Sequence, residues 1–285
     1  MSPARNLWRR LNNGFALALV YALTGLALIP LALVLWYTIV KGLPAASRLG
    51  FYLNVERPVG IPGGGVAHAI AGTGVMVGLA SLIAIPLGVI AGVNLVEFGG
   101  RFARSVRLAA DVLVGAPSIA IGLFAYALFV APFHHFSGIS GALALAVLML
   151  PVVIRTTEGA VALIPAALRE SGLALGLPRW RVALQLVLPA AAPGVITGAL
   201  LAMARAAGET APLLFTGFGN RIWSVDPTQP MSALPLIVFH DALTPYPSLQ
   251  EQAWGAAMVL VAAMLVVNLS SRWVVRRQAR FAGRL

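Results

Sequence analysis

The chain has 285 residues, of which 59% are hydrophobic and only 10% are charged, with a mean hydropathy of +0.89. This composition excludes a soluble enzyme and indicates one polytopic membrane protein, with no room for a second domain. The lack of cysteine excludes disulfides and thiolate metal sites. In so apolar a chain, a formal charge of +11 reports membrane orientation and contact with anionic lipid rather than nucleic-acid binding.

The first three apolar segments are each long enough to cross a membrane. At 1.5 Å of rise per residue, the run from about Phe15 to Val40 can cross a ~30 Å hydrocarbon core with some tilt. The second span, from about Val66 to Val96, is rich in small residues that allow close helix packing. A basic loop over 97–107 precedes the third span, from about Leu108 to Ala131, which we expect to be kinked at Pro117.

The second half of the chain contains three more spans. We expect the fourth, from about Ile139 to Gly159, to be broken at Pro151, and the fifth to run from about Ala191 to Gly217. In the loop that follows, the apolar piece Ala233–Phe239 is too short to span, so it should lie at the membrane interface or dip partway in. The sixth span runs from about Ala253 to Trp273.

These segments together predict an all-α, polytopic integral membrane protein with six transmembrane helices. It should form a single transmembrane domain over residues 1–285, with a core of about 66–273. With six spans, both termini, the loop at 97–107 and a polar stretch at 168–189 fall on one side, which holds fourteen arginines. Four basic residues lie opposite, so by the positive-inside rule we expect both termini to be cytoplasmic; the four are Lys41, Arg48, Arg57 and Arg221.

The polar stretch Leu168–Pro189 reads as a helical hairpin. A helix over Ala166–Leu175 should end at Gly176, and Pro178 should open a second helix over 179–188, because glycine suits a helix stop and proline a helix start. One side of the hairpin is apolar and the other is charged, so it should project into water as a contact surface. The apolar side has Leu168, Leu173 and Leu175, and the charged, exposed side has Arg169, Glu170, Arg179 and Arg181.

The spacing in this hairpin resembles the EAA loop of ABC-importer permeases. Glu170-Ser171-Gly172 stands where Glu-Ala-Ala is typical, Gly176 is the loop glycine, and Leu186, Leu188 and Pro189 close the pattern. Gly172 departs from alanine and Leu186 from isoleucine, but neither change removes the charge or the turn. The resemblance implies a type I importer permease fold of the MetI kind, in a bacterial inner membrane. It also implies that the coupling loop 165–189 sits on a cytoplasmic ATPase dimer through Glu170, Gly172, Gly176, Pro178, Arg179 and Pro189.

No catalytic constellation is found in the sequence. Lys41, the sole lysine, does not follow a glycine-rich loop, so the chain cannot be a Walker-type ATPase and a partner must hydrolyse any ATP used. The nine acidic residues are scattered, with no close pair within one span for proton relay. The four histidines lack metal-ligand spacing and are expected to be structural or at the surface. We therefore expect a non-catalytic subunit without metal or cofactor.

Charged residues inside the predicted spans are candidates for a translocation path. An arginine at mid-helix costs roughly 2.5–3.5 kcal/mol on insertion scales, so it should face protein or a water-filled path. Arg205 falls near the middle of the fifth predicted span with Glu209 one turn on, and Arg155 and Glu158 lie near the end of the fourth. An internal ion pair that serves packing only, or a snorkelling Arg155, stays open as an alternative.

The segment Arg205-Ala206-Ala207-Gly208-Glu209-Thr210-Ala211-Pro212-Leu213-Leu214-Phe215-Thr216 narrows the resemblance to phosphate-importer permeases of the PstA type. That family implies a path for inorganic phosphate that includes Thr210, a second permease subunit of the PstC type, and a periplasmic phosphate-binding protein. A permease for sulfate or molybdate, and a membrane receptor or regulator without flux, remain the alternatives.

Overall fold

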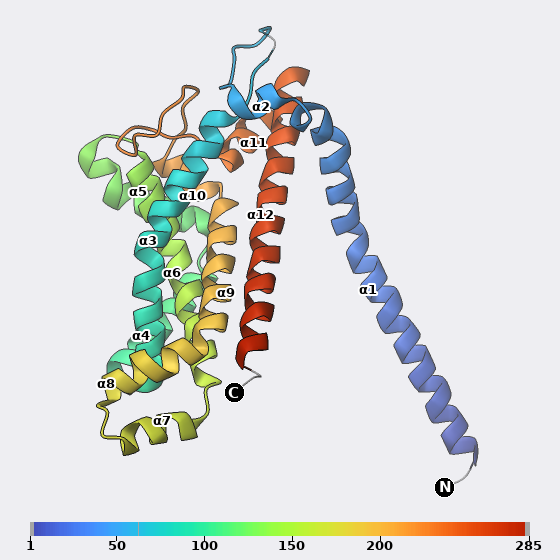
Figure 1. The fold of residues 1–285 in the computed structure, drawn as a ribbon. Helices are drawn as coiled ribbons and strands as arrows, with labels where there is room; N and C mark the ends of the chain where they lie inside the picture. Colours follow the sequence, from blue (N-terminus) through green and yellow to red (C-terminus); the bar gives the residue numbers. More distant parts are fainter. Residues whose placement is uncertain (1–2, 62, 283–285) are drawn as a thin grey trace.

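The computed structural model describes residues 3–61 and 63–282, and every regular element in this part of the chain is a helix (Figure 1). The all-α prediction is confirmed. Within the described residues, five helices are long and apolar enough to cross a membrane, or six if one bent pair counts as a span, as predicted. The five are Asn12–Ala46, Ala67–Glu97, Gly138–Ala162, Arg179–Ala207 and Pro247–Ser270.

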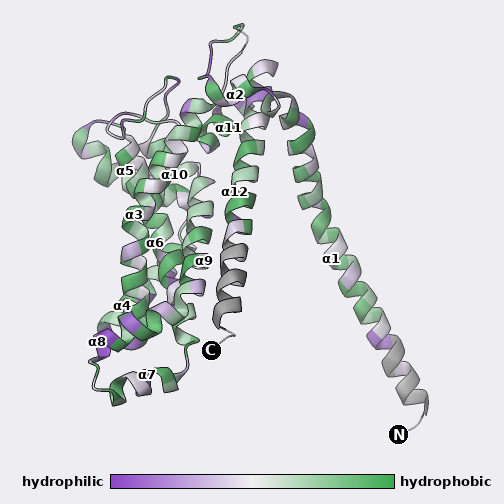
Figure 2. Ribbon diagram, viewed as in Figure 1, coloured by the Kyte–Doolittle hydropathy of each residue, from purple (hydrophilic) through white to green (hydrophobic). Residues whose placement is uncertain are grey.

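The first helix, α1 (Pro3–Ala46), leans away from the other helices and approaches them only toward its C-terminal end (Figure 1). There it packs on α12 (Pro247–Ala282), where the rings of Tyr37 and Trp254 lie 6.2 Å apart between centroids. Between Phe15 and Tyr37, α1 is mostly apolar and exposed, and Figure 2 shows the apolar colouring along this part of the helix. Such a surface requires hydrocarbon or another membrane chain around it.

The centre of the fold is the pair α3 (Ala67–Glu97) and α6 (Gly138–Ala162). Glycines on α3 let the two backbones approach: a Cβ added at Gly88 would lie 2.7 Å from Val153 Cβ, and one at Gly92 would lie 2.6 Å from Thr157 Cβ. This matches the small-residue packing expected of membrane helices. Around this contact lies the main core, which includes Met76, Leu145, Met149, Val153, Leu213 and Leu236.

The third predicted span is a sharply bent pair rather than one kinked helix. α4 (Gly100–Gly115) and α5 (Ser118–Phe129) are bent by 112° relative to each other, so the helix is interrupted at the predicted place, Pro117, rather than merely kinked there. The residue before a proline avoids the helical region, and Ala116 accordingly has φ −71° and ψ 136°. The expected basic loop over 97–107 is also short, because Arg101, Arg104 and Arg107 already lie in α4.

The predicted break at Pro151 is wrong, since α6 runs through this residue without interruption. Pro151 is buried, and α3, α4 and α9 pack around α6. A proline removes one backbone hydrogen bond, and neighbouring helices allow a membrane helix to tolerate that loss.

The fifth predicted span ends earlier than expected. The helical turns α8 (Arg179–Arg181), a π-helix (Val182–Val187) and α9 (Leu188–Ala207) follow one another without a break and stop before Gly208. α10 (Ala211–Thr216) is a separate short helix. Glycine is a poor helix former, and a proline at the second position of α10 supplies no N–H to a preceding turn, so Gly208–Thr210 forms a break.

The end of the bundle opposite α7 (Ala166–Ala174) holds α2 (Leu49–Leu53) and α11 (Leu234–Ala242) (Figure 1). The apolar piece 233–239, expected at the membrane interface or dipping partway in, forms most of α11, which packs against α3 and α12 and buries Leu234, Leu236 and Ile237. The beginning of α1 and the end of α12 lie at the same end as α7 (Figure 1), in agreement with an even number of crossings. Arg284, one of the fourteen arginines counted on the side of the termini, lies outside the described residues.

The close approach at Gly72 of α3 provides a test of this packing. A Cβ at Gly72 would collide with the carbonyl oxygen of Ser232, whereas one at Gly74 would meet nothing within 4 Å. Gly72→Ala should therefore lower stability by about 1–3 kcal/mol through overpacking, measured as a lower Tm in detergent. Gly74→Ala is the matched control and should leave Tm unchanged or slightly higher, because alanine favours the helix. Equal Tm values for the two variants would contradict this packing.

Candidate functional site

The hairpin predicted at 166–188 is present. α7 ends at Ala174, and Gly176 has φ +79°, a backbone conformation that glycine adopts without strain. The Gly176 N–H donates to Leu173 O at 2.9 Å and the Leu177 N–H donates to Gly172 O at 3.2 Å, which closes the helix end. Pro178 precedes the second helical segment, as expected.

Gly172, the departure from the usual alanine, lies where α7 rests on the π-helix. It is buried, and a Cβ there would lie 2.6 Å from Leu186 Cδ1 and 3.0 Å from Val182 Cγ2. The missing side chain therefore lets α7 lie close to Val182–Val187. This packing offsets the lower helix propensity of glycine. π-helical turns occur often at functional sites, and this one joins the hairpin to α9.

The outer surface of the hairpin mixes charged and apolar side chains. Glu170, Pro178, Arg179 and Pro189 are all exposed, in line with their predicted role in contact with a partner. The side predicted to be apolar is not covered by the bundle: Leu173 is 43% exposed and Leu175 is 82% exposed. Charged groups beside exposed leucines and Trp180 form a surface suited to a protein partner rather than to solvent alone.

Arg169 does not lie on the exposed charged side, where the sequence placed it. Its Nε donates to Glu97 Oε1 at 2.8 Å, and the other two nitrogens bond carbonyl oxygens at the end of α6. The sequence pattern gave no sign of this contact, because 72 positions separate Arg169 from Glu97.

Arg155 and Glu158 belong to an ion-pair network between α6 and α4. Arg155 Nη1 lies 2.6 Å from Glu158 Oε2, and Arg107 Nη2 lies 2.6 Å from Glu158 Oε1. Arg155 also pairs with Asp111, a residue that the sequence analysis did not single out. Two arginines and two carboxylates balance their charges, so the network holds the two helices together at little net charge.

Arg205, Glu209 and Thr210 lie at the break between α9 and α10. Arg205 is in the last turn of α9, at the end of the continuous helix rather than near its middle as predicted. The expected i to i+4 pair is present, with Arg205 Nε 3.6 Å from Glu209 Oε1. The Arg205 side chain is 53% exposed and that of Glu209 is 17% exposed. The Thr210 carbonyl accepts from the N–H groups of Leu213 and Leu214 in α10, both at 3.1 Å.

The two sets of predicted path residues are not joined. Among the described residues, the contacts of Arg155 and Glu158 lead to α4, whereas the break at Gly208 packs against Met264 of α12. A half-exposed arginine on an apolar helix needs a protein or aqueous surface beside it. Arg205 therefore presents its charge outward from this chain, and Arg155 does not.

A polar cluster that sequence reasoning missed lies at the opposite end from α7. The carboxylate of Glu56 is 4% exposed and lies 3.0 Å from Arg221 Nε, while Asp241 is 2% exposed and its Oδ2 has no hydrogen-bond partner. Burial and the nearby Glu56 charge raise the pKa of Asp241 to about 7, against a smaller lowering by Arg221. Burial raises the pKa of Glu56, and burial together with Arg221 lowers that of His240.

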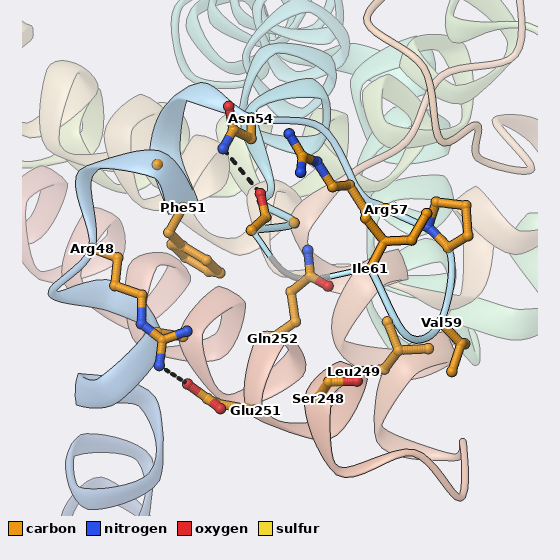
Figure 3. Close-up of a pocket in the computed structure, with 15 residues that line it drawn as sticks. Arg48, Phe51, Asn54, Arg57, Val59, Ile61, Ser248, Leu249, Glu251 and Gln252 are labelled. Atoms are coloured by element: carbon orange, nitrogen blue, oxygen red, sulfur yellow. Dashed lines mark hydrogen bonds and ion pairs between the residues drawn. The ribbon is translucent and has the colours of Figure 1, made fainter.

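A cavity of about 240 Å³ lies beside this end, between the α2 region and the start of α12 (Figure 3). Arg48 Nη2 pairs with Glu251 Oε1 at 2.9 Å along its edge, and Gln252 Nε2 donates to Gly65 O at 2.9 Å. These contacts tie the loop that follows α1 to α12. Among the described residues there is no group of three or more His, Cys, Asp or Glu placed to hold a metal ion.

Residues 84–282 match the family described as the binding-protein-dependent transport system inner membrane component. The phosphate transport system permease protein PstA of Yersinia pestis is 41% identical over 276 residues, which cover 96% of this chain and 93% of the relative. PstA 1 of Mycobacterium tuberculosis is 39% identical over 284 residues, which cover 96% of this chain and 92% of the relative.

Among solved structures, an inward-facing form of the MetNI methionine ABC transporter contains a similar chain. It aligns with a TM-score of 0.58 at 18% identity and covers 74% of this chain and 93% of the other. A likeness at this identity reports the fold of the shared region.

The buried Asp241 should make stability depend on pH. The pKa of Asp241 is about 7 in the folded chain and 3.8 for an ordinary aspartate, the value expected in the unfolded chain. Between pH 3.8 and pH 7 the folded chain therefore holds a proton that the unfolded chain has released. The stabilisation present at low pH is therefore lost as pH rises toward 7. Tm in detergent should be less reduced between pH 5 and pH 8 in Asp241→Asn than in the wild type.

Asp226→Asn is the matched control for this prediction. Asp226 is exposed, and its hydrogen bonds with Thr228 lower its pKa. Asp226 therefore stays ionised between pH 5 and pH 8, and the pH dependence of Tm in Asp226→Asn should stay close to that of the wild type. The same pH dependence in Asp241→Asn and in the wild type would show that Asp241 carries no extra proton in the folded chain.

Proposed function

Because the chain belongs to the binding-protein-dependent transport inner membrane components, and among them to the permeases of the PstA type, we propose that it carries inorganic phosphate across the inner membrane as one half of an ATP-driven importer. The observation that supports this most is the identity of about 40% with PstA permeases over nearly the whole chain. The resemblance stated from Arg205 to Thr216 is thereby confirmed at the level of the family.

Membership in this family also confirms the importer-permease fold and the multi-pass membrane location. The chain is a non-catalytic permease subunit that works with an ATPase and further transport components. We propose that those components are a second permease subunit of the PstC type, a cytoplasmic ATPase dimer and a periplasmic phosphate-binding protein. The permease domain would extend over 1–285, with a core of about 66–273, and membrane lipid would cover much of α1.

The proposed ATPase contact is the hairpin surface at 165–189. Glu170 and Arg179 would meet the ATPase, while Gly172, Gly176 and Pro178 would give the hairpin its shape and Pro189 would lead into α9. The exposure of this surface, the mixture of leucine and charge on it, and its attachment to α9 support this assignment. Movement of the ATPase subunits would then act on α6 and α9, which the hairpin joins.

The proposed path for the anion passes the break between α9 and α10. Arg205 would attract phosphate there, with Glu209 holding the guanidinium and Thr210 beside it; Arg155 and Glu158 would contribute from α6. The half-exposed Arg205 side chain supports the first part of this proposal. The pairing of Arg155 with Asp111 and Glu158 favours a supporting role for α6, where the charges already balance.

Phosphate uptake by Arg205 variants tests the function and the path together. Arg205→Gln should lower uptake per inserted complex at least tenfold, because the anion loses its positive partner and Glu209 is left unpaired. Arg205→Gln with Glu209→Gln should restore assembly but not uptake, since no buried charge then remains unpaired. Arg205→Lys should keep part of the flux, because it retains the charge but loses the planar fork.

The measurement is uptake of labelled phosphate in cells that lack the chromosomal copy of this chain. Restored uptake in the double glutamine variant would leave Arg205 as a packing residue. Stronger competition by sulfate or molybdate than by unlabelled phosphate would favour another oxyanion, and no uptake by the wild type would favour a receptor without flux.

Cysteine labelling tests the proposed orientation, and the chain has no cysteine of its own to confuse the result. Gln229 is exposed in the segment that leads into α11, the helix at the end opposite α7, and Arg104 is exposed in α4, shortly after Glu97, which Arg169 of α7 contacts. A membrane-impermeant thiol reagent added to intact spheroplasts should label Gln229→Cys and should reach Arg104→Cys only after permeabilisation. The reverse pattern would place both termini outside.

A further inference from the structure

The guanidinium of Arg169 joins three helices, of which α6 and α7 are neighbours in sequence and α3 is not. From its place on α7, Arg169 donates from Nε to Glu97 Oε1 at 2.8 Å, from Nη1 to Ile164 O at 2.5 Å, and from Nη2 to Val161 O at 3.0 Å. Glu97 is the last residue of α3, and Val161 lies in the last turn of α6. One side chain therefore fastens the hairpin to the ends of both central helices.

The chemistry of this contact suits arginine in particular. Carbonyl groups at and just beyond the C-terminal end of a helix favour a cation nearby. The Glu97 side chain is only 11% exposed, so its charge depends on Arg169 rather than on water. The planar guanidinium group can donate hydrogen bonds to the carboxylate and to both carbonyl groups at once, whereas the ammonium group of a lysine is a single point of charge.

Apolar packing supports the same connection. Val93 and the partly buried Val96 of α3 belong to one cluster with Val161, Val182 and Val187. The end of α3 thus lies on the base of the hairpin and on the π-helix that leads to α9. Because α6 and α9 adjoin the hairpin in sequence and α3 does not, Arg169 and this cluster hold α3 in place of a covalent link.

The far end of α3 contacts the segment that covers the opposite end of the bundle. Thr73 Oγ1 accepts from the Leu234 N–H at 2.9 Å, and Gly72 packs directly on the Ser232 carbonyl. α3 has 31 residues, which is roughly 46 Å of helix at 1.5 Å per residue. A single helix therefore reaches from the hairpin to Ser232–Leu234.

We propose that Arg169 is a positioning residue that fastens the coupling loop to Glu97 and so makes α3 a third path by which loop movement reaches the segment Ser232–Leu234. The proposal rests on the proposed function of the loop as the ATPase contact. It assigns Arg169 to the transmission of movement, apart from the exposed residues that meet the ATPase.

Transport and hydrolysis measured together in proteoliposomes test this role. The full importer, with its binding protein, would carry Glu97→Gln, Arg169→Met or both. Each single change should leave basal ATP hydrolysis within twofold and lower phosphate transported per ATP hydrolysed about tenfold. The double variant should be no worse than Arg169→Met, because both changes remove one contact. Arg169→Lys should fall between, and the exposed Arg104→Met is the matched control, with wild-type transport per ATP.

Spin labels give a readout that does not depend on phosphate. Labels on Ser171→Cys of α7 and Ile90→Cys of α3, both exposed, should show a narrow distance distribution that broadens when Glu97→Gln is added. The proposal would be overturned if the distance distribution stayed narrow or if Glu97→Gln transported phosphate like the wild type. It would also be overturned if the losses multiplied to about a hundredfold in the double variant, or if the single variants failed to assemble. If the spin-label distances change as expected but the wild-type importer moves no phosphate, the proposed function is rejected and the role of Arg169 in fastening the loop is not.

Discussion

The close approach of α3 and α6 is the constraint on which the rest of the structure depends. In lipid the hydrophobic effect does not draw apolar helices together, so contact must come from backbones that can approach closely. Gly88 and Gly92 give α3 that contact against Val153 and Thr157, and Gly72 extends it to the segment at Ser232. Once this pair is fixed, α4, α9 and α11 have surfaces to pack on, and α6 stays helical through its proline.

Charge is distributed so that ions near the membrane are paired across helices. Arg107 and Glu158 tie α4 to α6, and Arg169 ties α7 to α3 and α6. Because each partner satisfies a group that would otherwise be desolvated alone, loss of one side is more damaging than loss of both. Arg205 differs in kind, since its pair with Glu209 is looser at 3.6 Å and more than half of its side chain is exposed.

Local signals in the sequence predicted much of the fold and part of the site. Apolar runs located the spans, Gly176 and Pro178 located the hairpin, and the i to i+4 spacing of Arg205 and Glu209 located their pair, because each depends on neighbours within one or two turns. The position of the bend at Pro117 was predicted but its angle was not, since the angle depends on how α5 packs against α6 and α10. The burial of Asp241 and the Glu97 contact of Arg169 join residues far apart in sequence, and no periodicity encodes such pairs.

The continuous helical path from Arg179 to Ala207 connects the two proposed functional surfaces directly. One end of this path is the hairpin, and the other carries Arg205 in its last turn. A helix transmits displacement along its axis because its backbone hydrogen bonds keep it stiff, whereas the non-helical break at Gly208–Thr210 can absorb rotation. If the ATPase displaces the hairpin as proposed, Arg205 must move with it while α10, packed on α5 and α6, can remain in place. The distance between Arg205 and the α10 side of the break would then change with each cycle, which is the kind of change that alternating affinity for an anion requires.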